Sequence, residues 1–110
     1  MKQIILLTSN VLTVSLTEFS EFKMDVNISY EYLRTCTTIL IKNSNMPFHI
    51  DIKQNIYGFI SVNIDINNRL SISHEFEPLT ENEYIVNVAH QMLIKVYDDY
   101  RKSERGHIIY

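Results

Sequence analysis

The stretch FKMDVNISYEY (Phe22–Tyr32) indicates the fold class, because apolar residues occupy every second position in it. Successive side chains of a β-strand point to opposite faces of the sheet. A strict period of two therefore gives one apolar face and one wet face, which is typical of an antiparallel strand. The apolar series is Phe22, Met24, Val26, Ile28, Tyr30 and Tyr32.

The chain continues with more strand signals after this stretch. A β-branched run at 37–41 is followed by the turn formers KNSNMP (Lys42–Pro47), which predict a hairpin. Alternation resumes at Phe48, and a further strand is expected from Ile56 to Ile66, with Gly58 as a bulge where that strand bends.

A three-residue loop at 67–69 is predicted by the side-chain pattern on either side of it. Pairing Ile66 with Leu70 keeps the isoleucines of both strands on one face, whereas a two-residue loop would oppose Ile66 with Arg69. Asparagine tolerates the left-handed backbone that such a loop needs.

The N-terminal residues are also predicted to be strands, at Gln3–Leu7 and Val11–Leu16. Polar residues at 8–10 interrupt the apolar run, and no small-residue cleavage site follows, so a signal peptide is not expected. The predicted sheet therefore occupies residues 1–76 and contains five to seven antiparallel strands.

A long amphipathic helix is predicted over residues 80–105. Thr80 and Glu83 have the spacing of a capping box, and Leu79 and Tyr84 that of a hydrophobic staple. Gly106 is the expected C-terminal stop, followed by an apolar tail at 107–110. The apolar stripe consists of Ile85, Val88, Ala89, Met92, Leu93, Val96 and Tyr100.

These elements predict one α+β domain spanning residues 1–110, an antiparallel sheet packed on one long C-terminal helix. The 110 residues are enough for a single hydrophobic core. No apolar stretch approaches the length that crosses a bilayer, so no membrane contact is expected. The mild acidity, with a pI near 5.7, fits a cytoplasmic protein or one that binds a basic partner.

Charge and cysteine content narrow the function classes. The net charge is −3, and the basic residues form no patch of the kind that binds phosphates, so no nucleic-acid partner is expected. The single cysteine, Cys36, cannot form an internal disulfide, which argues against a stapled secreted scaffold.

Signals for catalysis, metal binding or a cofactor are weak. His49 and Asp51 share a strand face and would supply two metal ligands, whereas a zinc site needs three or four. Cys36 has no evident base beside it, and no nucleophile elbow or phosphate-binding glycine loop is present. We therefore expect a protein that is not an enzyme and uses no metal or cofactor.

Aromatic residues are the main candidates for a binding surface. Tyr57 and Phe59 are predicted on the sheet face opposite Ile60, and one helix covers one face of a sheet. Either these aromatics are exposed for a partner, or they belong to the core and the isoleucines face outward. Tyr30 and Tyr32, at the end of the alternating strand, are candidates of the same kind.

The stretch NMPFHIDIKQNIYGFISVN (Asn45–Asn63) resembles the central hairpin of SecB-type export chaperones. The matching positions are Pro47-Phe48, Ile50, Ile52, Gly58-Phe59 and Val62, with Asn87, Leu93, Tyr97, Arg101 and Gly106 in the helix. The resemblance implies a holdase that binds unfolded client proteins through an apolar groove and associates with itself.

Two versions of a protein-binding function follow. The first is a SecB-like chaperone for a client protein. The alternative is a small acidic inhibitor, such as a toxin-immunity protein or a phage anti-defence protein, that blocks a folded enzyme such as a nuclease. The acidic candidates for that contact are Asp25, Glu31, Asp51, Asp65, Glu75 and Glu77.

Overall fold

A computed structural model describes residues 2–42 and 47–109, with side chains for 3–42 and 47–103, and within them lie two helices and five strands. The elements in chain order are α1 (Lys2–Glu18), β1 (Met24–Glu31), β2 (Arg34–Ile41), β3 (Pro47–Gln54), β4 (Ile60–Ile66), β5 (Leu70–Phe76) and α2 (Asn82–Ile109). Each strand pairs antiparallel with the next one along the chain, so the sheet is an open meander. The predicted α+β class is confirmed.

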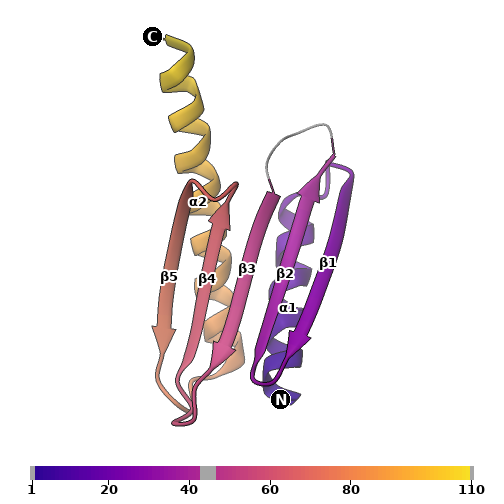
Figure 1. Ribbon diagram of the computed structural model, residues 1–110, viewed down its shortest axis with the longest axis vertical. Helices are drawn as coiled ribbons and strands as arrows, with labels where there is room; N and C mark the ends of the chain where they lie inside the picture. The colour runs from indigo at the N-terminus through magenta and orange to yellow at the C-terminus, as the bar shows by residue number, and fades with distance from the viewer. Residues whose placement is uncertain (1, 43–46, 110) are drawn as a thin grey trace.

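Both helices cover the same face of the sheet and lie behind it in Figure 1. α1 packs on β2 and β3, and α2 packs on β4 and β5, so each helix covers two strands. The core lies between these two layers. It is built from the alternate inward residues of β2, β3 and β4 together with the inner stripes of both helices.

The hydrophobic alternation of the central strands sets their register. Ile50 of β3 lies opposite Ile64 of β4, and both side chains are buried beneath the helices. Ile66 pairs with Leu70, as the predicted three-residue loop requires. Asn67 and Asn68 hold φ values of 55° and 56°, the left-handed backbone that asparagine tolerates.

The N-terminal segment is a helix, so the strands predicted at Gln3–Leu7 and Val11–Leu16 are wrong. The buried residues of α1 recur at helical spacings of three and four rather than at alternate positions. They are Ile4, Leu7, Thr8, Val11 and Ser15, with Phe19 buried directly after the helix. Local preference of threonine and valine for strands is overridden by packing of this stripe onto the sheet.

Hydroxyl groups explain how a helix rich in serine and threonine can be packed against a core. Thr8 Oγ1 donates to the carbonyl of Ile4, and Ser15 Oγ donates to that of Val11, each four residues back. Buried hydroxyls are thereby satisfied within the helix itself.

The C-terminal helix is confirmed, but its ends differ from the prediction. α2 starts at Asn82, and Thr80 Oγ1 donates to the carbonyl of Glu77 instead of capping it. The helix continues through Gly106 to Ile109, so the predicted end of the helix at Gly106 is wrong. Side chains of the predicted tail at 107–110 lie outside the described part of the chain.

Two strand predictions also need correction. β4 begins at Ile60, and residues 55–59 form a loop, so Gly58 is not a bulge within a strand. The inner face of β1 is not buried, although it is apolar: Val26 and Tyr30 are exposed, because the helices stop short of this edge strand.

Candidate functional site

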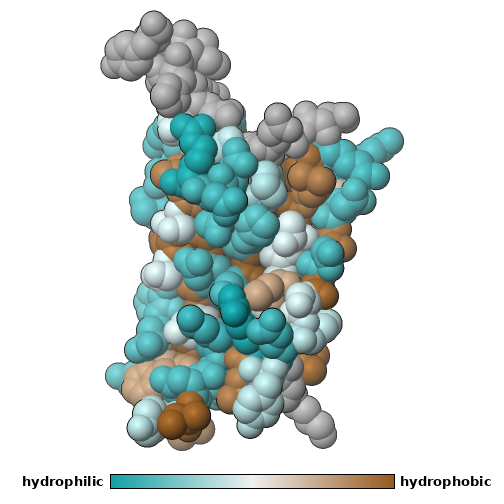
Figure 2. Space-filling model, in the orientation of Figure 1, coloured by the Kyte–Doolittle hydropathy of each residue, from teal (hydrophilic) through white to brown (hydrophobic). Residues whose placement is uncertain are grey.

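The open face of the sheet carries mainly polar side chains. Figure 2 views this face, and hydrophilic and neutral residues cover most of it. The residues that alternate with the buried ones on β2, β3 and β4 include Arg34, Cys36, Thr38, His49, Asp51, Lys53, Ser61, Asn63 and Asp65. Apart from the exposed Leu40 of β2, the isoleucines, valine and phenylalanine of these strands face the helices, so the polar side of β4 is the solvent-exposed one.

A shallow hollow of about 410 Å³ lies on this face over β3, β4 and β5. Its lining is Asp51, Lys53, Ser61, Asn63, Ser73, His74 and Glu75. Asp51 is held by Arg34, whose Nε and Nη2 donate to the two carboxylate oxygens at 3.1 and 2.9 Å. This hydrogen-bonded ion pair raises the pKa of the Arg34 guanidinium further above its ordinary value. Asp51 is therefore a paired side chain rather than a free base.

Cys36 lies beside this ion pair, with its Sγ 3.8 Å from Asp51 Oδ1. Burial, and then the negative charge of Asp51, raise the pKa of the Cys36 thiol. Nucleophilic cysteines need the opposite shift, because the thiolate is the reactive form. Nearby, His49 Nδ1 lies 3.2 Å from the hydroxyl of Thr38. The most reactive side chains of this face, Cys36, Asp51 and His49, are thus engaged in contacts within the protein.

Neither a metal site nor a membrane span is found in the described residues. No three side chains of His, Cys, Asp or Glu gather there closely enough to hold a metal ion. In the same part of the chain, neither helix combines the length and the apolar character needed to cross a bilayer.

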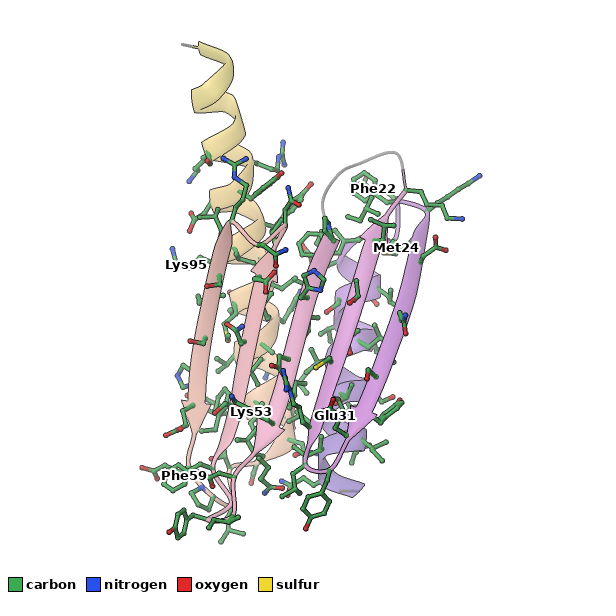
Figure 3. The ribbon with its side chains drawn as sticks, in the orientation of Figure 1. Phe22, Met24, Glu31, Lys53, Phe59 and Lys95 are labelled. Atoms are coloured by element: carbon green, nitrogen blue, oxygen red, sulfur yellow. The ribbon has the colours of Figure 1, made fainter. Side chains whose placement is uncertain are left out.

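A second candidate surface, which we name the apolar end, lies where three connections meet at the lower end of the molecule in Figure 1. Its members are Tyr32, Ile56, Tyr57, Phe59 and Leu79. Tyr32 is 86% exposed, Ile56 85%, Tyr57 74% and Leu79 97%. Figure 3 shows Phe59 at this end, and Figure 2 shows hydrophobic surface there.

Hydrogen bonds and close packing join the three connections. The N–H of Gln54 donates to the carbonyl of Leu33, which ties the β1–β2 turn to the end of β3. A Cβ placed on Gly58 would lie 3.2 Å from Cβ of Pro78, so the β3–β4 loop touches the segment before α2. The apolar side chains therefore stand on neighbouring connections at the same end of the molecule.

The β3–β4 loop is organised around Asn55. Its Oδ1 accepts hydrogen bonds from the backbone N–H of Tyr57 at 2.9 Å and of Phe59 at 3.0 Å. Gly58 has a φ of +93°, which side chains other than glycine rarely adopt. This geometry fixes the loop backbone while it leaves Ile56 and Tyr57 pointing into solvent.

Leu79 adopts a costly backbone conformation with no packing contact to justify it. Its φ is 68°, and the left-handed region costs a residue with a Cβ about 1–2 kcal/mol. Its almost complete exposure also shows that the predicted staple between Leu79 and Tyr84 is wrong. Backbone strain of this kind often marks a functional position.

The structure distributes the predicted site residues over three places. Tyr32, Tyr57 and Phe59 meet at the apolar end, but on loops rather than on a sheet face. Tyr30 lies on the edge strand β1. The acidic candidates Asp51 and Glu75 both line the hollow.

Glu77 lies apart from that acidic pair, in the connection before α2. Ile56 and Leu79 are surface residues that the sequence patterns did not predict. Each directly follows a turn-forming residue, Asn55 before Ile56 and Pro78 before Leu79. These turn formers were the only sequence signal that Ile56 and Leu79 lie on loops.

Comparison with protein-family models, with curated proteins and with solved structures gives no match to this chain.

Proposed function

We propose that the chain is a non-enzymatic protein-binding protein, a holdase that keeps apolar segments of client proteins on its apolar end. The observation that carries the proposal is the concentration of exposed apolar side chains on three joined connections. Scattered exposed apolar residues are normal on a soluble protein, whereas a contiguous group marks an interaction surface.

The side chains of this surface suit adaptable binding. Tyr32 and Tyr57 offer large apolar rings with a polar tip, and Ile56 and Leu79 offer aliphatic contact without charge. Aromatic residues are enriched in the centres of protein interfaces. Their positions on loops, above a rigid sheet, support contact with clients of varied sequence.

Leu79 adds a second argument for a client-binding role. Asparagine or glycine would satisfy a φ of 68° with less strain, so an exposed leucine there is unfavourable for the folded chain alone. Contact with a client would offset that cost. We therefore expect Leu79→Asn to stabilise the folded chain slightly and to weaken client binding.

The test is suppression of aggregation of dithiothreitol-reduced insulin, followed by light scattering. The wild-type chain is expected to suppress scattering at a molar excess of a few-fold. A variant with Ile56→Ser, Tyr57→Ser and Leu79→Asn is expected to need at least about fivefold more protein, since loss of interface anchors costs about 1 kcal/mol or more each.

A matched control is Leu40→Ser, because Leu40 is also exposed but stands on the open face of β2. This variant should suppress aggregation as well as the wild type. Absence of suppression by the wild-type chain, or equal suppression by the triple variant with unchanged circular dichroism, would overturn the proposal.

The inhibitor hypothesis draws support from a different feature, the hollow that brings Asp51 and Glu75 together on the open face. Glu75 offers a carboxylate there to a basic side chain of a folded enzyme, beside Lys53 and the Asp51 that Arg34 already binds. Selective formation of a 1:1 complex with one folded enzyme, together with no effect on insulin aggregation, would favour this second function over the first.

A further inference from the structure

The outer edge of β1 offers an unpaired row of backbone groups. The N–H of Lys42 donates to the carbonyl of Lys23, so these two residues form a hydrogen-bonded pair. Such pairs alternate along antiparallel strands. The odd-numbered residues of β1 therefore bond to β2. The N–H and C=O groups that point to the open edge belong to Met24, Val26, Ile28 and Tyr30.

This edge lacks most of the features that usually prevent association. Proteins protect edge strands with proline, bulges, charged side chains or a covering element. The charges of β1 are Asp25 and Glu31, on the face away from the helices. β1 has eight residues, contains no proline, and pairs with β2 in unbroken register. The opposite edge strand, β5, packs against α2, whereas within residues 2–42 and 47–109 the backbone of neither helix comes close to β1.

The side chains above this edge are apolar and incompletely covered. Val26 is 39% exposed and Tyr30 55%, although both face the helix side of the sheet. Met24 and Ile28, on the same side, are partly exposed. Because α1 and α2 each cover two strands, β1 is the fifth strand, left beyond the helix layer.

We propose that β1 pairs antiparallel with β1 of a second copy of the chain, with Asn27 opposite Asn27 on a two-fold axis. In this register Val26 lies opposite the partner's Ile28, and Met24 opposite the partner's Tyr30. Each residue whose backbone N–H and C=O point outward then lies opposite a partner residue whose N–H and C=O also point outward. The ladder of backbone hydrogen bonds therefore continues across the interface.

Charge complementarity selects this register over its neighbours. It places the exposed Lys23 opposite the partner's Glu31, and the two-fold axis repeats this pair. A shift that opposes Ile28 with itself brings Asp25 against the partner's Glu31. The shift in the other direction brings Glu31 against the partner's Glu21. Like charges directly opposite one another destabilise a sheet, so both shifts are unfavourable.

The helices leave room for this arrangement. α1 lies over β2 and β3, so the two α1 helices would be separated by four strand spacings, about 19 Å. Packed helices need about 8–10 Å, and no clash results. Figure 3 labels Met24 and Glu31 at opposite ends of β1, where each would meet the complementary end of the partner strand.

Disulfide trapping tests the register directly. In a Cys36→Ser background, Asn27→Cys is expected to cross-link two chains on mild oxidation, because facing residues at a non-hydrogen-bonded site have Cα atoms about 4.5 Å apart. Ser29→Cys is the matched control, since residue 29 would face the partner's Asp25. It should cross-link far less.

Charge exchange tests the same model without a covalent bond. Lys23→Glu and Glu31→Lys should each raise the dimer dissociation constant about fivefold or more, because each creates two like-charge contacts. The double variant should return to within about twofold of wild type. Analytical ultracentrifugation gives these constants, and circular dichroism verifies folding.

Two outcomes would overturn the proposal. One is a wild-type chain that remains monomeric at about 100 µM. The edge of β1 would then be available for pairing with a strand of another protein instead of a second copy. The other is a dimer in which the charge exchanges have no effect and Ser29→Cys cross-links as well as Asn27→Cys.

Discussion

Cys36 shows how burial and a neighbouring carboxylate raise the pKa of a thiol. Its thiol keeps its proton because burial and the charge of Asp51 raise its pKa above the usual 9.0. The folded chain therefore binds this proton more tightly than the unfolded chain does. The contribution of Cys36 to the free energy of unfolding is complete below pH 9 and decreases as the pH rises above it.

Alkylation of Cys36 by iodoacetamide at about pH 8.5 reports this shift. We expect the native chain to react more slowly than the urea-unfolded chain, because less of the native thiol is ionised. Asp51→Asn should accelerate the native reaction, since it removes a charge that raises the pKa and leaves Arg34 nearby. Glu75→Gln is the control, and mass spectrometry measures the rates. Equal rates for Asp51→Asn and wild type would contradict this explanation.

At the scale of elements, a buried hydroxyl pair fixes α1 on β2. Thr8 Oγ1 and Thr35 Oγ1 lie 2.6 Å apart, and Thr8 also donates to the carbonyl of Ile4. Thr8 has one hydroxyl proton, which goes to Ile4, so Thr35 is the donor within the pair. Loss of the acceptor and loss of the donor therefore have different consequences.

A double-mutant cycle on this pair is expected to be asymmetric. Thr8→Val leaves a buried donor on Thr35 without an acceptor and should lower the free energy of unfolding by about 1–3 kcal/mol. Thr35→Val leaves Thr8 bonded to Ile4 and should cost less. The double variant should be close to Thr35→Val, because both hydroxyls are gone. Urea denaturation measures all three, and additive effects would argue against the pairing.

At the scale of the whole molecule, Phe19 joins three elements. Its ring lies 4.8 Å from that of Phe48 on β3 and 5.2 Å from that of Tyr97 on α2, between ring centroids. It is 2% exposed and directly follows α1. The end of α1 thus holds the sheet and the C-terminal helix together.

We expect Phe19→Ala to lower the free energy of unfolding by about 3–5 kcal/mol, the usual cost of removing a buried ring. Phe22→Ala is the matched control. The Phe22 ring contacts the Phe19 ring in a tilted arrangement with centroids 6.5 Å apart, and Phe22 is 38% exposed, so its loss should cost less than about 1 kcal/mol. Urea denaturation followed by circular dichroism compares them. Similar losses for both variants would show that Phe19 does not have this joining role.

Sequence periodicity was enough to predict those elements that have one buried side and one solvent-exposed side. The alternation in β4 and β5 and the stripe of α2 separate apolar from polar positions, so the three-residue loop, the pairing of Ile66 with Leu70 and the helix followed without a structure. The pattern left open which face of β4 is buried, and the packing of the helices decided it. The α1 segment was wrongly predicted as strands because its valines and threonines favour strands locally. Its buried stripe also includes hydroxyl residues, which donate hydrogen bonds to backbone carbonyls of the same helix.

The candidate surfaces were decided by tertiary structure. The sequence indicated Tyr32, Tyr57 and Phe59 as candidate binding residues and left open whether Tyr57 and Phe59 are exposed or in the core. Their meeting at one end depends on the meander, which brings alternate connections together. Likewise, the alternation of β1 predicted an apolar face, whereas its exposure follows from two helices that cover four of the five described strands. Local pattern fixes which face of an element is apolar. Only the packing of distant elements determines whether that face is covered.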